Sequence, residues 1–236
     1  MPRLHYMTTG AWNAWFPASL RHKLPSLTNY SDPDSLVSRL RRRRWELLLE
    51  HFPHLADWRV LDLGGTVQFW QAAPVAPQSV TVLNLQADHS NTPSIIAVTG
   101  DALNPPESIE STYDLVVSNS LIEHVGGASE RRRLADVVRE RAPRHWVQTP
   151  NRNFPIEPHW VFPGMQFLPT EQRAMVAQYW PFGHEHSATR DQARHDVLDV
   201  ELIDVRELAA CFPTSTIVHE RFAGLSKSLI AVAGSR

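Results

Sequence analysis

The stretch Arg59-Val-Leu-Asp-Leu-Gly-Gly-Thr66 decides the fold class of this 236-residue chain. It is an apolar run with an acidic residue near its end, followed directly by two glycines. A short continuous apolar run is typical of a strand that is buried on both faces of a parallel sheet. Glycines let the backbone turn tightly and approach a ligand closely. The stretch therefore predicts a buried strand that ends in a ligand-binding turn.

Further short apolar runs follow at intervals that suit an alternating α/β chain. We predict strands at residues 60–63, 80–85, 95–98, 115–118, 146–148, 215–219 and 228–232, and helices at residues 35–52, 66–73, 130–141, 168–179 and 204–212. Asp204 is the predicted cap of the last helix, and Asp34 or Ser35 that of the first. Strands that alternate with helices form a parallel sheet with right-handed crossovers. The last two strands are joined by a short connection around Gly224, so they should run antiparallel.

The composition is that of one globular domain. Hydrophobic residues make up 42% of the chain and charged residues 20%, which excludes a disordered protein. The net charge of −2 gives no general attraction to nucleic acid or to anionic membranes. Cys211 is the only cysteine, so an intrachain disulfide and a cysteine metal cluster are excluded. The sequence shows no signal peptide or membrane-spanning run, and we therefore expect a cytoplasmic protein.

Residues 1–34 differ from the rest of the chain because they combine prolines with aromatic side chains. Prolines interrupt regular structure, so this segment is predicted to form a loop with a short helix. Trp12, Trp15 and Phe16 would be unfavourable in water, so the arm should pack on the body or on a partner. We expect residues 1–34 to form a lid over the substrate pocket and residues 35–236 to form one domain. The aromatic arm also favours a homodimer.

Three motifs give the chain a resemblance to the class I S-adenosylmethionine-dependent methyltransferases. Val60-Leu-Asp-Leu-Gly-Gly65 is similar to the first motif of that family, Gly100-Asp-Ala102 to its motif after the third strand, and the run from Tyr113 to His124 to its fourth-strand motif. The resemblance extends from about residue 40 to residue 233. It implies a three-layer α/β fold with a doubly wound, mostly parallel seven-stranded sheet and one antiparallel strand near the C-terminus. It also implies S-adenosylmethionine as cofactor.

The same resemblance assigns cofactor contacts to residues at the ends of the first four strands. These residues are Asp62, Gly64, Gly65, Asn84, Leu85, Asp101, Ala102 and Asn119. The chain departs from the family pattern in two ways. Thr66 and Gln68 replace further glycines, and Asn84 replaces the acidic residue that accepts hydrogen bonds from the ribose. An amide oxygen still accepts from a hydroxyl, but without the gain of a charge. Structural alternatives are that Asp62 caps the next helix and that Asp101 caps the following turn.

Other nucleotide-binding patterns do not fit the sequence. The first turn lacks the G-x-G-x-x-G pattern of dinucleotide-binding dehydrogenases. The chain also lacks a Gly-Lys-Ser/Thr phosphate loop. A nucleoside that carries a sulfonium needs no backbone amides to hold phosphates, so these absences favour the methyl donor.

Residues 149–164 form the predicted acceptor site, because this segment leaves the fifth strand at the ligand-binding edge of the sheet. Its four prolines restrict the backbone, which suits a loop that positions side chains. An extended Glu157-Pro-His159 would project both ionisable side chains to the same side. A neutral imidazole is a suitable base for a hydroxyl, so His159 and Glu157 are candidate catalytic residues. The alternative is that both only fix the loop through hydrogen bonds.

Glu123 and His124 follow the fourth strand, where the donor methyl group should face the acceptor. Both are candidate catalytic residues, and His124 is as readily a structural histidine. Together with Glu157 and His159 they could also ligate a divalent ion such as Mg²⁺, which would acidify an acceptor hydroxyl. No spacing motif supports a metal site, so its existence stays open. A second histidine pair, His184-Glu-His186, is expected on a surface loop.

Four consecutive arginines, Arg41–Arg44, raise the question of nucleic-acid binding. On a helix they spread around the circumference, and Glu46 and Glu50 are within reach of them. A solvated helix face is the simplest interpretation. The functional alternative is an inward-pointing arginine that holds the carboxylate of the donor. The interleaved aromatic side chains expected for RNA binding are absent, so we expect no nucleic-acid partner.

These observations predict a methyltransferase that transfers a methyl group from S-adenosylmethionine to a hydroxyl of a small molecule or sugar. The run from Asn151 to His159 is similar to loops of bacterial methyltransferases in sugar and glycan pathways. Trp12, Trp15, Trp160 and Phe162 could stack on a sugar face, although aromatic residues suit many ligands and more often simply pack. Transfer is an in-line displacement, for which proximity is the larger contribution. Two rival interpretations remain: a methyltransferase that acts on RNA or protein, and a non-catalytic binding protein with the same fold.

Overall fold

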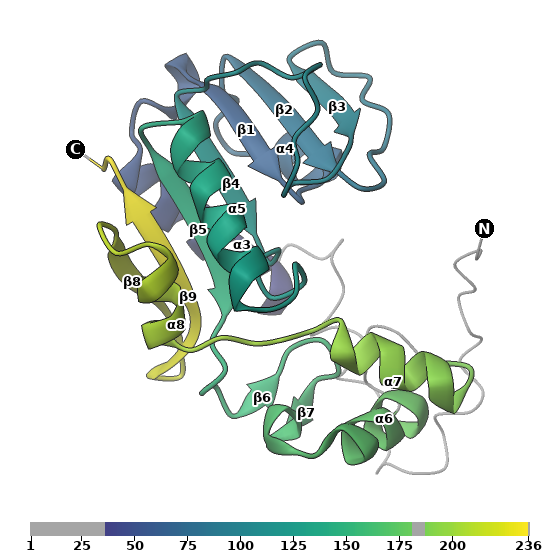
Figure 1. Cartoon of the computed structure of the whole chain (residues 1–236). Coiled ribbons are helices and arrows are strands. Elements are labelled where there is room, and N and C mark those ends of the chain that lie inside the picture. The colour runs from purple at the N-terminus through teal and green to yellow at the C-terminus, as the bar shows by residue number, and fades with distance from the viewer. Residues whose placement is uncertain (1–35, 181–186, 236) are drawn as a thin grey trace. The chain divides into compact units, whose positions relative to one another are not determined.

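The structure is a computed structural model of the chain, shown in Figure 1. It describes residues 36–180 and 187–235. Several predictions concern residues outside these ranges. They are the aromatic arm of residues 1–34, the expected caps Asp34 and Ser35, and the histidine pair of residues 184–186.

The chain divides into two compact units, residues 1–47 and residues 48–236. The boundary lies inside helix α3 (Leu36–His51). In the second unit the last turn of α3 buries Leu48, and Phe52 follows with its ring centroid 5.8 Å from that of Trp58. No helix among the described residues is long and apolar enough to span a membrane.

Seven strands of the second unit form one mixed sheet (Figure 1). They are β1 (Arg59–Leu63), β2 (Ser79–Asn84), β3 (Ile95–Thr99), β4 (Leu115–Asn119), β5 (His145–Pro150), β8 (Thr216–Phe222) and β9 (Leu225–Ala233). The order across the sheet is β3-β2-β1-β4-β5-β9-β8. Strand β9 runs antiparallel to both of its neighbours, and the other pairings are parallel. The predicted seven-stranded, mostly parallel sheet with an antiparallel C-terminal strand is confirmed.

Strands β1 and β4 lie at the centre of the sheet and are buried on both faces. Residues 60–63 and residues 115–117 have no exposed surface. Water is excluded from both sides of such strands, so their sequences are continuous apolar runs rather than alternating ones. The parallel register places Asp62 opposite Val117. The carboxyl ends of these two strands therefore lie side by side.

Five further helices follow in the described residues. They are α4 (Val67–Gln71), α5 (Ala128–Arg141), α6 (Thr170–Tyr179), α7 (Arg190–Leu198) and α8 (Val205–Cys211). The predicted cap of α8 is confirmed: the Asp204 side chain accepts from the Glu207 main-chain nitrogen, and the Glu207 side chain accepts from that of Asp204. Helix α7 was not predicted, because Ala193 and Val197 are its only buried residues.

A small second core lies between β5 and α8, where the sequence predicted a loop and the helix of residues 168–179, which is α6. Strands β6 (Ile156–Glu157) and β7 (Phe162–Pro163) form a two-stranded hairpin, and the 3-10 helix η3 (Met165–Phe167) follows it. This core consists of Trp160, Met165, Ala174, Ala177, Ala193, Val197, Val200 and Leu202. The acceptor segment is thus anchored by its own apolar cluster.

Two details of the predicted acceptor segment are wrong. Glu157-Pro-His159 is not extended, because residues 158–161 form the turn between β6 and β7. Trp160 is only 4% exposed, so its ring packs in the second core and cannot stack on a sugar. Phe162 is partly buried and packs edge-on against Trp180, with ring centroids 5.0 Å apart. An aromatic residue in a short hairpin anchors the turn by burying its ring.

Candidate functional site

The turn after β1 is built from two glycines that neighbouring side chains surround closely. Gly64 has a φ of 77°, a conformation that glycine adopts without strain. A Cβ on Gly64 would lie 2.8 Å from Leu121 Cδ1, and a Cβ on Gly65 would lie 1.7 Å from Asp62 Oδ2. The turn therefore carries no side chain of its own, and Leu121 and Asp62 pack directly against its backbone at the carboxyl edge of the sheet.

Asp62 is the acidic residue beside this turn, and it is fully buried. Its Oδ2 accepts a hydrogen bond from Trp70 Nε1 at 2.6 Å. Burial raises the pKa of the Asp62 carboxyl to about 7, and the bond from Trp70 opposes this rise. Within the described part of the chain, Asp62 Oδ1 has no hydrogen-bond partner. A buried acceptor without a partner next to a bare turn fits a ligand that brings a donor group or an ordered water.

Asn84, at the end of β2, holds the glycine turn from the other side. Its Nδ2 donates to Gly64 O at 3.1 Å and to Gly65 O at 2.8 Å. Its Oδ1 accepts from Gln86 N at 3.3 Å. A carboxylate could not make the first two bonds, because it has no hydrogen to donate. The amide therefore has a structural function that the sequence interpretation missed.

The predicted cofactor residues near β2 and β3 differ in their surroundings. Asp101 Oδ1 accepts from Leu103 N and Oδ2 from Asn104 Nδ2, both at 2.8 Å. These bonds are those of a residue that caps the following turn, which was the structural alternative for Asp101. Each oxygen keeps further acceptor capacity. Ala102 is 8% exposed, whereas Leu85 is 71% exposed. An apolar side chain at this edge is thus accessible to a flat ring.

Asn119 ends β4, and its Oδ1 accepts a long bond of 3.4 Å from Trp146 Nε1. The next residue, Ser120, has a φ of 53°, which is unfavourable for a residue with a Cβ. Its main-chain nitrogen donates to Gln148 O at 2.9 Å, and this bond holds the turn against β5. Strained backbone at a strand end is frequent at functional sites.

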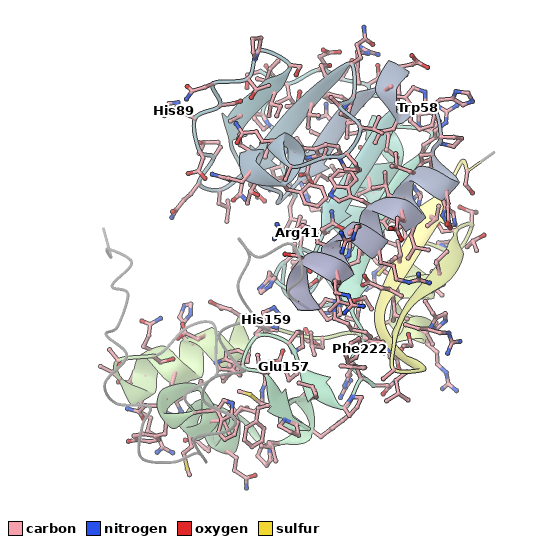
Figure 2. The ribbon with its side chains drawn as sticks, turned by 180° about the vertical axis from the view of Figure 1, so that it is seen from behind. Arg41, Trp58, His89, Glu157, His159 and Phe222 are labelled. Atoms are coloured by element: carbon pink, nitrogen blue, oxygen red, sulfur yellow. The ribbon has the colours of Figure 1, made fainter. Side chains whose placement is uncertain are left out.

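Glu157 and His159 form a hydrogen-bonded pair at the acceptor end of the site. Figure 2 labels both residues on the segment that carries β6 and β7. Glu157 is 3% exposed; its Oε1 lies 2.7 Å from His159 Nδ1, and its Oε2 accepts from Trp160 N at 2.8 Å. A carboxylate can only accept, so His159 Nδ1 carries the proton. In a neutral ring the lone pair then lies on Nε2, and a ring held by a carboxylate in this way has the arrangement of an oriented base.

His124 approaches the same ring from the turn after β4. Its Nε2 lies 3.2 Å from His159 Nε2, and the two rings meet edge to face. Burial lowers the pKa of His124, and the neighbouring His159 lowers it further, whereas Asp199 and Glu157 act in the opposite direction. His124 is therefore neutral near pH 7.

Glu123 precedes His124 and is fully buried. Its Oε2 accepts from Thr149 Oγ1 at 2.9 Å, and its main-chain oxygen accepts from Glu201 N at 2.8 Å. Ligand atoms of Glu123, His124 and His159 all lie within 4.8 Å of one another. The structure thus brings three of the four suggested metal ligands together, and the fourth, Glu157, stands behind His159.

Leu121 connects the glycine turn with the histidine pair. Its side chain lies against Gly64, and its main-chain oxygen accepts from His124 N at 2.8 Å. Strand β4 pairs with β1 on one side and with β5 on the other. The residues that follow these three strands therefore meet at one edge of the sheet. None of the site residues predicted from the sequence lines two surface cavities of about 370 and 260 Å³ near β2 and β3, and Trp70 lines the smaller one.

Sequence reasoning missed two residues of the site, Trp70 and Thr149. Trp70 donates to the buried carboxylate of Asp62, and Thr149 to that of Glu123. Trp70 lies on the short helix α4, where an apolar packing function was the simpler expectation. Thr149 is the last residue but one of β5, and its inward orientation depends on the sheet register, which the sequence does not show.

Comparisons with known proteins support the fold. No protein-family model and no curated protein matches the sequence. The chain is similar to an S-adenosylmethionine dependent methyltransferase from Mesorhizobium loti, at 16% identity and a TM-score of 0.50, over 80% of this chain and 96% of that chain. A candidate S-adenosylmethionine dependent methyltransferase from Listeria monocytogenes is similar at 9% identity and a TM-score of 0.50, over 84% and 99%.

A third similar structure carries a different name. It comes from Rhodobacter sphaeroides and is named as a candidate Zn-dependent alcohol dehydrogenase, with 12% identity and a TM-score of 0.51 over 82% of this chain and 89% of that chain. At such identities a likeness shows the fold and not the activity. The chain therefore has the α/β fold of S-adenosylmethionine-dependent methyltransferases, and its activity must be argued from the site.

Proposed function

We propose that this chain is an S-adenosylmethionine-dependent methyltransferase. The observation that carries the proposal is the bare turn of Gly64 and Gly65 beside the buried carboxylate of Asp62. The turn lies at the carboxyl edge of the sheet, which is where α/β folds of this kind bind nucleosides. The Oδ1 atom of Asp62, which has no partner among the described residues, fits the amino group of the donor or a water bound to it.

The residues that would hold the cofactor are those at the ends of the first four strands. They are Asp62, Gly64, Gly65, Asn84, Leu85, Asp101, Ala102 and Asn119. When bound, S-adenosylmethionine supplies a methyl group that is already activated for displacement. The exposed side chain of Leu85 suits contact with the adenine ring, and Asn84 Oδ1 can accept from a ribose hydroxyl.

The acceptor is a hydroxyl of a small molecule or sugar. His159 Nε2 accepts the proton of this hydroxyl, and the Glu157 carboxylate stabilises the imidazolium through the bond of 2.7 Å to Nδ1. His124 and Glu123 stand next to this position and orient the acceptor. The support is the bond from His159 Nδ1 to Glu157, because a ring that holds its proton on Nδ1 presents Nε2 as the basic atom.

The two rival functions, an RNA or protein methyltransferase and a non-catalytic binding protein, can each be tested against an observation or an experiment. Arg42 and Arg43 are exposed and Arg41 and Arg44 half-buried, as expected of a solvated helix face. Salt-dependent binding of RNA would favour an RNA methyltransferase. A homodimer and a cytoplasmic location stay predictions of the sequence.

Isothermal titration of the full chain with S-adenosylmethionine and with S-adenosylhomocysteine tests the cofactor proposal. We expect saturable binding of both ligands, with one site per chain. An absence of heat at about 1 mM ligand, which would mean less than about 4 kcal/mol of binding free energy, contradicts every enzyme interpretation and leaves the non-catalytic protein.

Substitution of the proposed base tests the acceptor end. His159→Ala should lower the rate of methyl transfer at least tenfold, because a general base contributes about 10²–10⁴-fold. Binding of S-adenosylhomocysteine should not change. The rate is measured as transfer of a labelled methyl group to a panel of sugar and phenol acceptors. His89→Ala, an exposed histidine in the loop after β2, is the control. An unchanged rate in His159→Ala would remove this residue from the mechanism.

A further inference from the structure

Two histidine nitrogens face each other at the acceptor end, 3.2 Å apart. The proton on His159 is fixed on Nδ1, since Glu157 Oε1 accepts from that atom at 2.7 Å. The Nε2 atom of the neutral His159 ring therefore points a lone pair toward His124.

His124 presents its Nε2 atom to the same point, because that atom lies 3.2 Å from His159 Nε2 and the two rings meet edge to face. Two imidazole nitrogens at this distance are bridged either by a proton, as in a hydrogen bond, or by a metal cation that both rings ligate.

Glu123 adds a carboxyl group to the same point. Its side chain is fully buried, and one of its oxygens lies within 4.8 Å of a ring nitrogen of His124 and of His159. Thr149 Oγ1 donates to Oε2 at 2.9 Å and so fixes the carboxylate plane. A buried carboxyl group beside two imidazole nitrogens is a cluster of the kind that ligates metals.

The geometry points to a metal site: we propose that Glu123, His124 and His159 bind one divalent transition-metal cation of the zinc class. Zn–N distances are about 2.0–2.1 Å, so nitrogens 3.2 Å apart subtend an angle of roughly 100° at the metal, near the tetrahedral value. Imidazole ligands suit zinc and its neighbours, whereas Mg²⁺ prefers oxygen ligands.

The surroundings of the three ligands match those of known metal sites. A metal-bound histidine usually donates its other N–H to a carboxylate or a carbonyl. Here Glu157 is that acceptor for His159. Three protein ligands leave a coordination position open, which is typical of catalytic rather than structural zinc.

Binding of the cation does not depend on the proposed methyltransferase function. Its role in catalysis rests on that function. An acceptor hydroxyl at the open position would be acidified by the cation and lose its proton to water. His159 is then a ligand, so the general-base role applies to the metal-free protein. The site joins the turn after β4 to the hairpin of β6 and β7, and thereby fixes the acceptor segment to the sheet.

Titration of the chelator-treated full chain with Zn²⁺ tests the site directly. We expect one Zn²⁺ per chain by calorimetry and by competition with a chromogenic chelator, and no comparable binding of Mg²⁺. His124→Gln and His159→Gln should each abolish this binding. Glu157→Gln should weaken it about 10–100-fold, as other outer partners of metal ligands do. The exposed-histidine control His89→Ala should bind as the wild type does.

Three results would overturn the metal site. The first is an absence of Zn²⁺ binding, which would leave a shared proton between the two histidines. The second is equal Zn²⁺ binding by the wild type and by a His124→Gln/His159→Gln double variant. The third is binding of Mg²⁺ as tight as that of Zn²⁺. Cobalt(II) absorption of the wild type gives a readout that needs no variant: a visible spectrum unlike that of aqueous cobalt is expected, and an unchanged aqueous spectrum contradicts the site. Titration with S-adenosylhomocysteine in parallel separates this result from the cofactor proposal, because either ligand can bind without the other.

Discussion

Replacement of Gly65 by alanine tests the packing of the nucleoside turn most sharply. The new Cβ would lie 1.7 Å from Asp62 Oδ2, so the Asp62 carboxylate must move. That oxygen accepts the 2.6 Å bond from Trp70 Nε1, and the movement breaks it. Loss of a hydrogen bond to a charged group costs about 1.5–3 kcal/mol. For a domain of this size the expected fall in Tm is roughly 3–12 °C.

Thermal and urea unfolding of Gly65→Ala, with titration of S-adenosylhomocysteine, provide the assay. Binding should be lost or strongly weakened, because the displaced carboxylate enters the turn. Gly127→Ala is the matched control. Its Cβ would meet only Glu130 Oε2, at 3.3 Å, and alanine at this helix cap should cost about 1 kcal/mol or less without an effect on binding. A Gly65→Ala protein as stable as the control and with wild-type affinity would refute the reasoning.

Two further predictions concern the same turn. Burial raises the pKa of Asp62 from 3.8 to about 7, so its contribution to stability is fully present below about pH 3.8 and is lost as the pH rises through about 7. Asp62→Asn should therefore flatten the decline of the unfolding free energy between about pH 4 and pH 8, and an equally steep decline in urea experiments would contradict this. Asn84→Asp removes two bonds to the carbonyls of Gly64 and Gly65 and should cost about 1–3 kcal/mol; a more stable variant would show that the amide does not hold the turn.

The sheet could be predicted from the sequence because its central strands are buried on both faces. Such strands appear as short continuous apolar runs, as in residues 60–63 and residues 115–117. The antiparallel end of the sheet could also be predicted, because Ala223 and Gly224 leave only two residues for the turn between β8 and β9. Both have positive φ values, of 49° and 81°, as the tight hairpin turn requires.

The acceptor segment could not be predicted in the same detail. Its apolar residues belong to a small core assembled from the β6–β7 hairpin, η3, α6 and α7, and such non-local packing leaves no periodic pattern. The sequence therefore left open whether Trp160 stacks on a ligand or packs, and the structure buries it. Glu157 and His159 were selected for their chemistry, and the turn rather than an extended backbone brings them together.

Hydrogen-bond direction is another property that residue types alone do not reveal. Asn84 was interpreted as an acceptor for the ribose, and the structure uses its amide hydrogens to hold the glycine turn. In the same way, the sequence grouped His124 and His159 only as candidate ligands of one ion, and their facing Nε2 atoms became visible only when β4 and the hairpin were placed in space.

The measurement that tests the central proposal most directly is a crystal structure of the full chain with S-adenosylhomocysteine. The account predicts an adenosyl group over Gly64 and Gly65, a donor to Asp62 Oδ1, and a sulfur atom that faces His124 and His159. A nucleoside bound at another place, or a turn that stays closed by side chains at saturating ligand, would contradict it.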